Sequence, residues 1–235
     1  DRTDSENALA TVTDKRQEWN LPPYNYAGNK NQPPFGETSG QCVSGIDKTP
    51  YVYKSVSTAK DLTAAPAMRN CGKFRREVIY EGQKTAKNLY TTINFPILRY
   101  SDVLLMYAEA SNELEGPTQA AYDCVEKVRS RAGIATRPFS EYDKETFREL
   151  VRNERGRELC FESLRRFDLI RWGNYVQEMN AYPTWAADAR WTENVTASRA
   201  ASIGGNVTAR NVLLPIPSIE LGVNKQLKQN SLWAN

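Results

Sequence analysis

Apolar residues recur at helical spacing in the middle of the chain. The three- and four-residue steps between residues 97 and 115 link Ile97, Tyr100, Leu104, Tyr107, Ala108 and Ser111. This is the period of an amphipathic helix, so we expect that stripe to face a core. Gly116 and Pro117 end the helix, and Pro117 fits the first turn of a second helix, which runs to about Ala132 and ends at Gly133.

A third helical pattern begins near Asp143. Its apolar positions are Phe147, Leu150, Val151, Leu159 and Phe161. We expect a break after Ser163 and a further helix over residues 164–172, ended by Gly173. Because only a short turn joins the first two helices, those two must lie antiparallel.

Two long stretches of the chain show no helical pattern. They are residues 19–41, which are dense in glycine and proline, and residues 180–211. Short β-like segments lie elsewhere, at residues 51–53 and 78–80. The sequence therefore predicts a mainly α fold with long irregular loops and minor β structure. We expect residues 1–93 to form a loop-rich segment of the same domain as the helical region 94–235.

The first two helices resemble a tetratricopeptide unit. Ala108 and Ala120 are twelve positions apart, the separation of the small residues where such helices cross. Ser111 and Cys124 depart from the pattern, since aromatic residues are usual there. One hairpin leaves apolar surface on its outer sides, so we expect neighbouring units to cover it. The alternative is an ordinary antiparallel hairpin in an α domain.

Composition and charge exclude several classes of function. The net charge of +3 is too small to indicate a nucleic-acid or membrane surface, and no apolar run approaches the roughly 18–20 residues of a membrane span. The chain has no histidine, and so lacks the commonest general base and the usual metal ligand. We expect no cofactor and no metal. The chain begins with neither Met nor an apolar signal segment, which indicates a processed chain or a fragment.

The four cysteines show no C-x-x-C spacing, so a zinc cluster is not expected. Cys124 and Cys160 lie in helical patterns, where we interpret them as buried small apolar residues. Cys42 and Cys71 lie in loop-like sequence and could form a disulfide bond if the protein is exported. The sequence leaves open whether they do.

Residues 147–172 contain seven arginines and five carboxylates. Glu154, Glu158 and Glu162 follow one another at four-residue steps, where Arg155 and Arg165 can reach them. A glycosidase also uses two carboxylates, but it needs one with a raised pKa, and abundant arginine lowers carboxylate pKa values. We therefore expect no catalysis here. Our interpretation is a structural network of Arg99, Glu154, Arg155, Glu158, Glu162, Arg165, Asp168 and Arg171.

Four sequence motifs follow one another between residues 94 and 233. They are NFPILRYSDVLLMYAEA (94–110), VEKVRSRAG (125–133), RNERGRELCFESLRRFDLIRWG (152–173) and LLPIPSIELGVNKQLKQN (213–230). In kind, order and spacing they resemble the motifs of SusD/RagB proteins. The departures are Ser163, where the family often has glycine, and Gly156, which lies inside a helix. Trp172 and Trp233 lie in these motifs, and we expect both in the core.

The resemblance implies a SusD-like fold and a lipoprotein on the outer membrane, exposed to the outside. It implies a TonB-dependent transporter of the SusC type as partner, and an oligosaccharide or peptide as ligand. The membrane would be reached only through a lipid anchor outside this chain, and no nucleic acid is involved. It also implies four tetratricopeptide-like units, most of them in an N-terminal half that this chain lacks.

Ligand contacts are not carried by these scaffold motifs, so residue chemistry has to select them. Sugars present apolar faces and hydroxyl rims, which suit an aromatic platform beside amides and charges. Two regions qualify: Trp19, Asn20, Tyr24, Tyr26 and Asn29 in one, and Tyr182, Trp185, Asp188, Arg190 and Trp191 in the other. For each aromatic residue, packing over the helices is the alternative.

A second class of function stays open, a tetratricopeptide-type adaptor that binds other proteins. Such adaptors have short turns and a polar concave groove. The long loops rich in Trp and Tyr favour the uptake lipoprotein.

Overall fold

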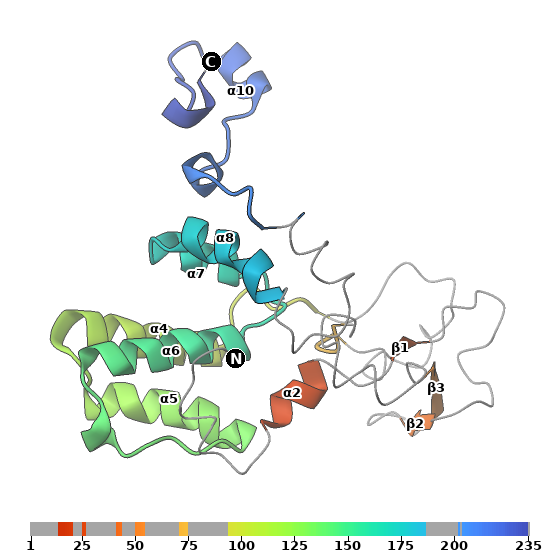
Figure 1. Cartoon of the computed structure of the whole chain (residues 1–235), viewed down its shortest axis with the longest axis vertical. Coiled ribbons are helices and arrows are strands. Elements are labelled where there is room, and N and C mark those ends of the chain that lie inside the picture. Colours follow the sequence, from red (N-terminus) through yellow and green to blue (C-terminus); the bar gives the residue numbers. More distant parts are fainter. Residues whose placement is uncertain are drawn as a thin grey trace. The chain divides into compact units, whose positions relative to one another are not determined.

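The computed structural model describes residues 14–20, 25–26, 41–43, 50–54, 71–74, 94–186, 202 and 204–234. The chain forms two compact units, Asp1–Arg165 and Arg166–Asn235, and each is described by itself (Figure 1). Helices predominate and strands are short, so the predicted fold class is confirmed. The division of the sequence near residue 93 stays a prediction.

Three helices form the core of the first unit. They are α4 (Tyr100–Glu115), α5 (Gln119–Ala132) and α6 (Lys144–Glu158), which lie side by side in Figure 1. The buried cluster between them consists of Leu105, Ala108, Ala121, Val125, Val128, Tyr142, Phe147, Leu150 and Val151. Each large aliphatic or aromatic side chain in this cluster contributes roughly 1.5–3 kcal/mol by leaving water.

The buried face of α4 differs from the predicted stripe. Ala108 is buried as expected, but Tyr100 is 70% exposed and Tyr107 is 50% exposed. Asp102 and Asn112 face the interior instead, because both find partners there. Asp102 accepts a hydrogen bond of 2.8 Å from Arg155, and Asn112 donates one of 2.9 Å to the carbonyl of Lys144. The helix also begins at Tyr100, three residues later than its apolar period suggests.

The crossing of α4 and α5 is offset by one residue from the tetratricopeptide spacing. Ala108 and Ala121 are fully buried, whereas Ala120 is exposed. Helix α5 begins after Thr118, whose side chain accepts a hydrogen bond from the N–H of Ala121, so Pro117 precedes the cap and is not in the first turn. Gly133 ends the helix in the left-handed conformation, as expected.

Helix α6 begins as predicted and ends earlier. Asp143 and Thr146 form a reciprocal capping box at its start. Its last residue is Glu158, and a turn follows in which Phe161 and Ser163 adopt φ values of 64° and 63°. Two left-handed residues other than glycine strain this turn. Helix α7 (Arg165–Arg171) follows.

The N-terminal part of the first unit is described in short pieces. They are helix α2 (Lys15–Asn20) and strands β1 (Asn25–Tyr26), β2 (Gln41–Val43) and β3 (Pro50–Lys54). The strands form an antiparallel sheet in the order β1-β3-β2, with Tyr26 opposite Tyr53 and Cys42 opposite Tyr51. The extended piece predicted at 51–53 is confirmed, and the one at 78–80 lies outside the described residues.

The second unit contains one long helix that the sequence did not predict. Helix α8 (Tyr175–Ala186) runs through Pro183, which has no N–H for the carbonyl of Met179. The N–H of Gly205 donates to that carbonyl instead, at 3.3 Å. A Cβ on Gly204 would clash with the same oxygen, so this approach of the backbone requires glycine.

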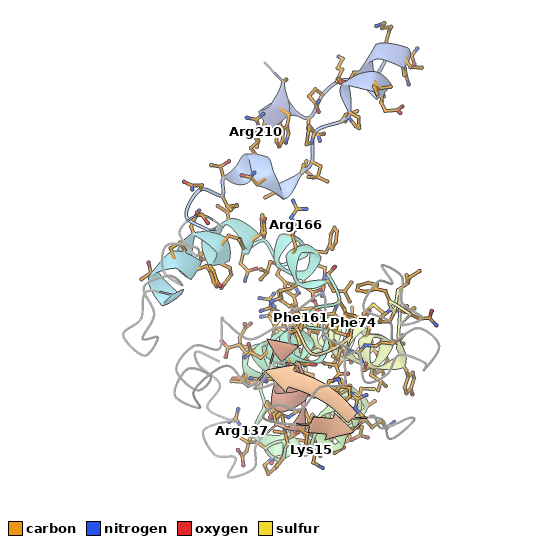
Figure 2. The ribbon with its side chains drawn as sticks, turned by 90° about the vertical axis from the view of Figure 1, so that its right-hand side faces the viewer. Lys15, Phe74, Arg137, Phe161, Arg166 and Arg210 are labelled. Carbon is orange, nitrogen blue, oxygen red and sulfur yellow. The ribbon has the colours of Figure 1, made fainter. Side chains whose placement is uncertain are left out.

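The C-terminal motif folds into a hydrogen-bonded clasp. Its elements are η5 (Ala209–Val212), α10 (Ser218–Val223) and η6 (Ser231–Trp233). The amide of Gln229 accepts from the N–H of Ile216 at 2.8 Å and donates to its carbonyl at 2.9 Å. The guanidinium carbon of Arg210, a residue labelled in Figure 2, lies 3.7 Å from the centroid of the Trp233 ring. Trp172 and Trp233 are both half-buried, so the expectation of core positions was wrong.

Candidate binding site

Three buried glutamates line up at the end of α6. Glu154 is fully buried, and Glu158 and Glu162 are almost fully buried. The first two lie one turn apart on the same face of the helix, and the strained turn after α6 places the third beside them. Buried carboxylates are costly unless they are paired, so their partners determine what this region can do.

The partners of these glutamates come from four separate segments. Glu158 accepts hydrogen bonds from Arg16 at 2.9 Å, and from Arg99 and Arg131 at 2.5 Å each. Glu154 forms ion pairs with Arg16 at 2.5 Å and with Arg129 at 3.2 Å. Glu162 forms ion pairs with Arg99 at 2.8 Å and with Lys73. We call these three glutamates and five cations the Glu158 network.

The same cations close the end of α6. The last carbonyls of a helix have no partner within the helix. Arg99 donates to the carbonyl of Glu158 at 2.5 Å, and Lys73 donates to it at 2.7 Å. Lys73 also reaches the carbonyl of Cys160 at 3.1 Å. Positive charge at this end is favourable to the helix dipole as well.

The ionisation of Glu158 follows from these contacts. Burial alone would raise its pKa, but hydrogen bonds from Arg131, Arg99 and Arg16 outweigh burial and lower the pKa from 4.5 to about 2. Burial likewise disfavours the charged form of Arg99, and Glu162 and Glu158 reverse this and raise its pKa. Glu158 is therefore an ion at neutral pH and cannot act as a general acid there.

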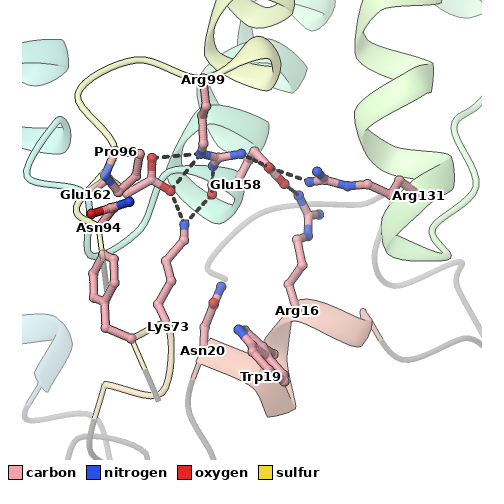
Figure 3. A pocket seen from close by; sticks show the side chains of 11 residues that line it. Arg16, Trp19, Asn20, Lys73, Asn94, Pro96, Arg99, Arg131, Glu158 and Glu162 are labelled. Atoms are coloured by element: carbon pink, nitrogen blue, oxygen red, sulfur yellow. Dashed lines mark hydrogen bonds and ion pairs between the residues drawn. The ribbon is translucent and has the colours of Figure 1, made fainter. Parts of the chain in front are cut away.

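A pocket of about 430 Å³ opens beside the Glu158 network (Figure 3). It is lined by Arg16, Trp19, Asn20, Lys73, Phe74, Asn94, Pro96, Arg99, Arg131, Glu158 and Glu162. Trp19 is 44% exposed, so a large part of this residue is accessible from the pocket side or from solvent. We call this the Trp19 pocket, and its size lies within the range of small-molecule sites.

Asn20 lies at the pocket as a buried anchor. Its side-chain amide donates to the sulfur of Cys160 at 3.0 Å. The main-chain carbonyl of Asn20 accepts a hydrogen bond from the N–H of Gly72 at 2.8 Å. These bonds join α2 and the segment 71–74 to the turn after α6. The sequence singled out Asn20 as a ligand contact; its side chain is buried against Cys160, and the ligand contact stays a prediction.

The other proposed ligand residues are only partly described. Tyr24, Asn29, Asp188, Arg190 and Trp191 lie outside the described residues. Tyr26 lies in β1 and Trp185 in α8, where the side chains are not described, and Tyr182 is half-buried on α8. Tyr182 and Trp185 thus belong to a helix, whereas an irregular loop was expected there. Trp19 and Tyr182 lie in different units.

The remaining residues of the expected network make other contacts. Arg155 pairs with Asp102 at 2.8 Å and approaches Glu109 at 3.9 Å, both on α4. Arg165 lies against Gly156 and donates to the carbonyl of Arg152 at 3.1 Å. In the second unit, Asp168 pairs with Arg171 at 2.9 Å.

Sequence reasoning missed four cations of the Glu158 network. They are Arg16, Lys73, Arg129 and Arg131. A signal existed for the last two, which lie two positions apart near the end of α5, within the second motif. Arg16 and Lys73 are far from α6 in sequence, and nothing near them indicates their partners.

Within the described residues, Cys71 is an exposed free thiol, so the possible bond to Cys42 is not formed. Cys124 and Cys160 are half-buried, less buried than expected. The described part of the chain has no group of three or more Cys, Asp and Glu side chains placed to hold a metal ion. It also has no helix long and apolar enough to cross a bilayer.

The profile of the SusD family matches residues 3–233, which is nearly the whole chain. The chain belongs to the SusD family. The SusD family is a family of non-catalytic binding proteins. The resemblance drawn from the four motifs is thereby confirmed.

Individual relatives extend this result. SusD-like protein P25 of Formosa agariphila is 38% identical over 145 residues, which cover 59% of this chain and 24% of that protein. SusD-like protein P2 of the same organism is 27% identical over 161 residues, which cover 65% of this chain and 28% of that protein. The chain thus spans about a quarter of the length of these curated relatives.

A solved structure shows the same architecture. The chain is similar to a SusD homologue from Bacteroides thetaiotaomicron, with a TM-score of 0.62 and 26% identity. The match covers 94% of this chain and 41% of the other. The SusD-like fold that the motifs implied is therefore confirmed.

Proposed function

We propose that this chain takes part in binding an oligosaccharide, or in some settings a peptide, at the cell surface. The chain would be the C-terminal part of a longer lipoprotein that delivers its ligand to a TonB-dependent transporter of the SusC type. Membership of the SusD family supports this role, since the family is one of surface binding proteins that work with such transporters.

The observation that carries the proposal is the half-exposed side chain of Trp19 in a pocket that combines apolar surface with polar and charged side chains. An aromatic face suits the apolar side of a sugar ring. The amide of Asn94 lies in the same pocket and can donate to sugar hydroxyls. The buried Glu158 network beneath gives these groups a rigid support.

A second ligand-binding region is proposed in the other unit, around Tyr182 and Trp185 on α8. Asp188, Arg190 and Trp191 follow directly in sequence and supply charged and aromatic groups. Their chemistry is the same as that of the Trp19 region, which is the support for including them. Tyr24, Tyr26 and Asn29 stay candidates on the side of Trp19.

The test is a binding titration of the full chain with a panel of neutral and acidic oligosaccharides and short peptides. Trp19→Ala should weaken binding of the best ligand about tenfold, because buried Trp contacts dominate binding energies. The matched control is Phe167→Ala, which removes another exposed aromatic residue, in the second unit. Thermal unfolding of both variants should stay close to the parent.

Equal affinities of the parent and Trp19→Ala for every ligand would refute the Trp19 pocket as the site. Binding by no member of the panel would refute the proposed function itself. The partner proposal has its own test, since the chain within its longer protein should copurify with a SusC-type transporter from the same cells.

A further inference from the structure

A second pocket of about 310 Å³ adjoins the Trp19 pocket. It is lined by Arg99, Tyr100, Ser101, Leu104, Lys127, Val128 and Arg131. We call it the Tyr100 pocket. Three of its lining residues are cations, and none of its described lining residues is a carboxylate. Tyr100 presents an exposed ring at the start of α4, and Leu104 and Val128 supply an apolar base.

The two pockets share a wall made of Arg99 and Arg131. The described residues around both pockets comprise five cations and two carboxylates: Arg16, Lys73, Arg99, Lys127 and Arg131 against Glu158 and Glu162. Both carboxylates already accept hydrogen bonds from within the Glu158 network. Arg16 and Lys73 are already paired with Asp14, Glu154 and Glu162. The excess of positive charge therefore lies at the Tyr100 pocket, whose lining holds three cations and no carboxylate.

Two of these cations have donors to spare. Arg131 uses one nitrogen for Glu158, and its side chain is 60% exposed. A guanidinium has five N–H groups, so most of those of Arg131 face the pocket or solvent. Lys127 is exposed, and among the described residues its ammonium has no hydrogen-bond or ion-pair partner. Arg131 lies one turn after Lys127 on α5, so two like charges occupy one helix face, which slightly destabilises a free helix.

We propose that Lys127 and Arg131 bind the anionic group of an acidic oligosaccharide, a carboxylate or a sulfate ester. The sugar ring that carries this group lies against Tyr100, and the rest of the oligosaccharide continues over the shared wall into the Trp19 pocket. Bidentate contact from a guanidinium suits both kinds of anion. This inference rests on the proposed function and specifies its ligand class.

An apolar neighbour is a poor occupant for this pocket. The open apolar side chains of Met106, Tyr107 and Leu114 lie further along α4, where a helical hairpin could cover them. The Tyr100 end differs, because covering it with an apolar surface would bury the ammonium of Lys127 without a partner and take the remaining N–H groups of Arg131 out of water. An anion relieves that cost and an apolar helix does not.

The experiment compares three ligands on the full chain by calorimetric titration: an oligogalacturonate, its methyl ester and a sulfated oligogalactan. The ester has the same sugar chain without the negative charges. We expect the acidic form to bind about tenfold or more tightly than its ester, with a difference that shrinks as salt is added. The sulfated ligand shows which of the two anions is preferred.

Lys127→Glu should weaken binding of the preferred acidic ligand about tenfold and leave the ester within about twofold. Lys225→Glu is the matched control, since it makes the same charge change at an exposed position in the second unit. Tyr100→Ala should weaken both the acidic and the ester form, because ring contact does not depend on charge. Each substituted residue is exposed, so the variants should fold as the parent does.

Three results would overturn the inference: equal affinity for the acidic and ester forms, equal effects of Lys127→Glu and Lys225→Glu, or no binding of either acidic ligand. The first two leave the proposed function standing, because glycans still bind and Trp19→Ala still weakens them. Loss of all binding across neutral and acidic glycans removes both. The two failures are therefore distinguishable.

Discussion

Arg99, just before α4, donates to both the side chain and the main-chain carbonyl of Glu158, the last residue of α6. One side chain thus neutralises a buried carboxylate and closes a helix end that has no partner of its own. It also forms the wall between the Trp19 and Tyr100 pockets. The contact that stabilises the end of α6 therefore also borders both proposed ligand pockets.

Glu158→Gln should destabilise the chain by about 3 kcal/mol, because Arg16, Arg99 and Arg131 would lose a common buried counter-charge. Urea denaturation measures the change in the free energy of unfolding. The control is Glu141→Gln, whose half-exposed carboxylate lies 4.0 Å from Arg137. That variant should change stability by less than about 0.5 kcal/mol. Equal effects of the two substitutions would contradict a structural role for Glu158.

Acid should remove the same contribution. The pKa of Glu158 is about 2 in the folded chain against 4.5 as the ordinary value, so the folded state holds the proton more weakly than the unfolded state. The stabilisation is present in full above about pH 4.5 and is lost as the pH falls towards 2, a total of about 3 kcal/mol at 1.36 kcal/mol per pKa unit.

Denaturation curves recorded from neutral to acid pH test this sign. The parent should lose more stability than Glu158→Gln over the acid range, because the variant has no carboxylate to protonate at this position. Parallel losses in the two proteins would show that other groups control the acid response.

Ser163→Gly should stabilise the chain by about 1 kcal/mol. Ser163 has a φ of 63°, a left-handed conformation that costs most residues about 1–2 kcal/mol and glycine very little. The same substitution at Ser130, an exposed position within α5, should instead cost about 0.5 kcal/mol through helix propensity. Thermal unfolding should show opposite shifts, and shifts of the same sign would contradict the strain.

Gln229→Glu should open the clasp of the second unit. The amide donates to the carbonyl of Ile216 and accepts from its N–H, whereas a carboxylate can only accept and would repel that carbonyl. We expect a cost of about 1–2 kcal/mol, seen as faster hydrogen exchange at the N–H of Ile216. Gln226→Glu, at an exposed position nearby, should leave that exchange rate unchanged.

Helices α4 to α7 could be predicted because apolar period, capping residues and glycines act locally, whereas α8 was missed because Pro183 lies inside it. Asp143, Gly133 and the break before Leu164 are examples, since each affects only its own turn of the chain. The buried face of α4 could not be predicted from apolar residues, because Asp102 and Asn112 are buried through hydrogen bonds to another helix and its start. Hydrophobic periodicity does not register such pairs.

The candidate site was predictable only in part. The three glutamates stand out by their four-residue steps, which one helix and its closing turn bring together. Their cations do not, because Arg16 and Lys73 approach across 142 and 85 residues of chain. Trp19 lies in the same pocket as Glu158 and Glu162 because Arg16, on the same helix as Trp19, pairs with Glu158. No local sequence pattern indicates such a long-range pair.

Cys71 gives this protein a natural attachment point for a fluorescent reporter. Its thiol is exposed and lies two positions before Lys73, which lines the Trp19 pocket. Burial raises the pKa of Cys124 and Cys160, so maleimide dyes at neutral pH should prefer Cys71 among the three described thiols. Emission from a dye placed there would report the arrival of a ligand without any engineered residue.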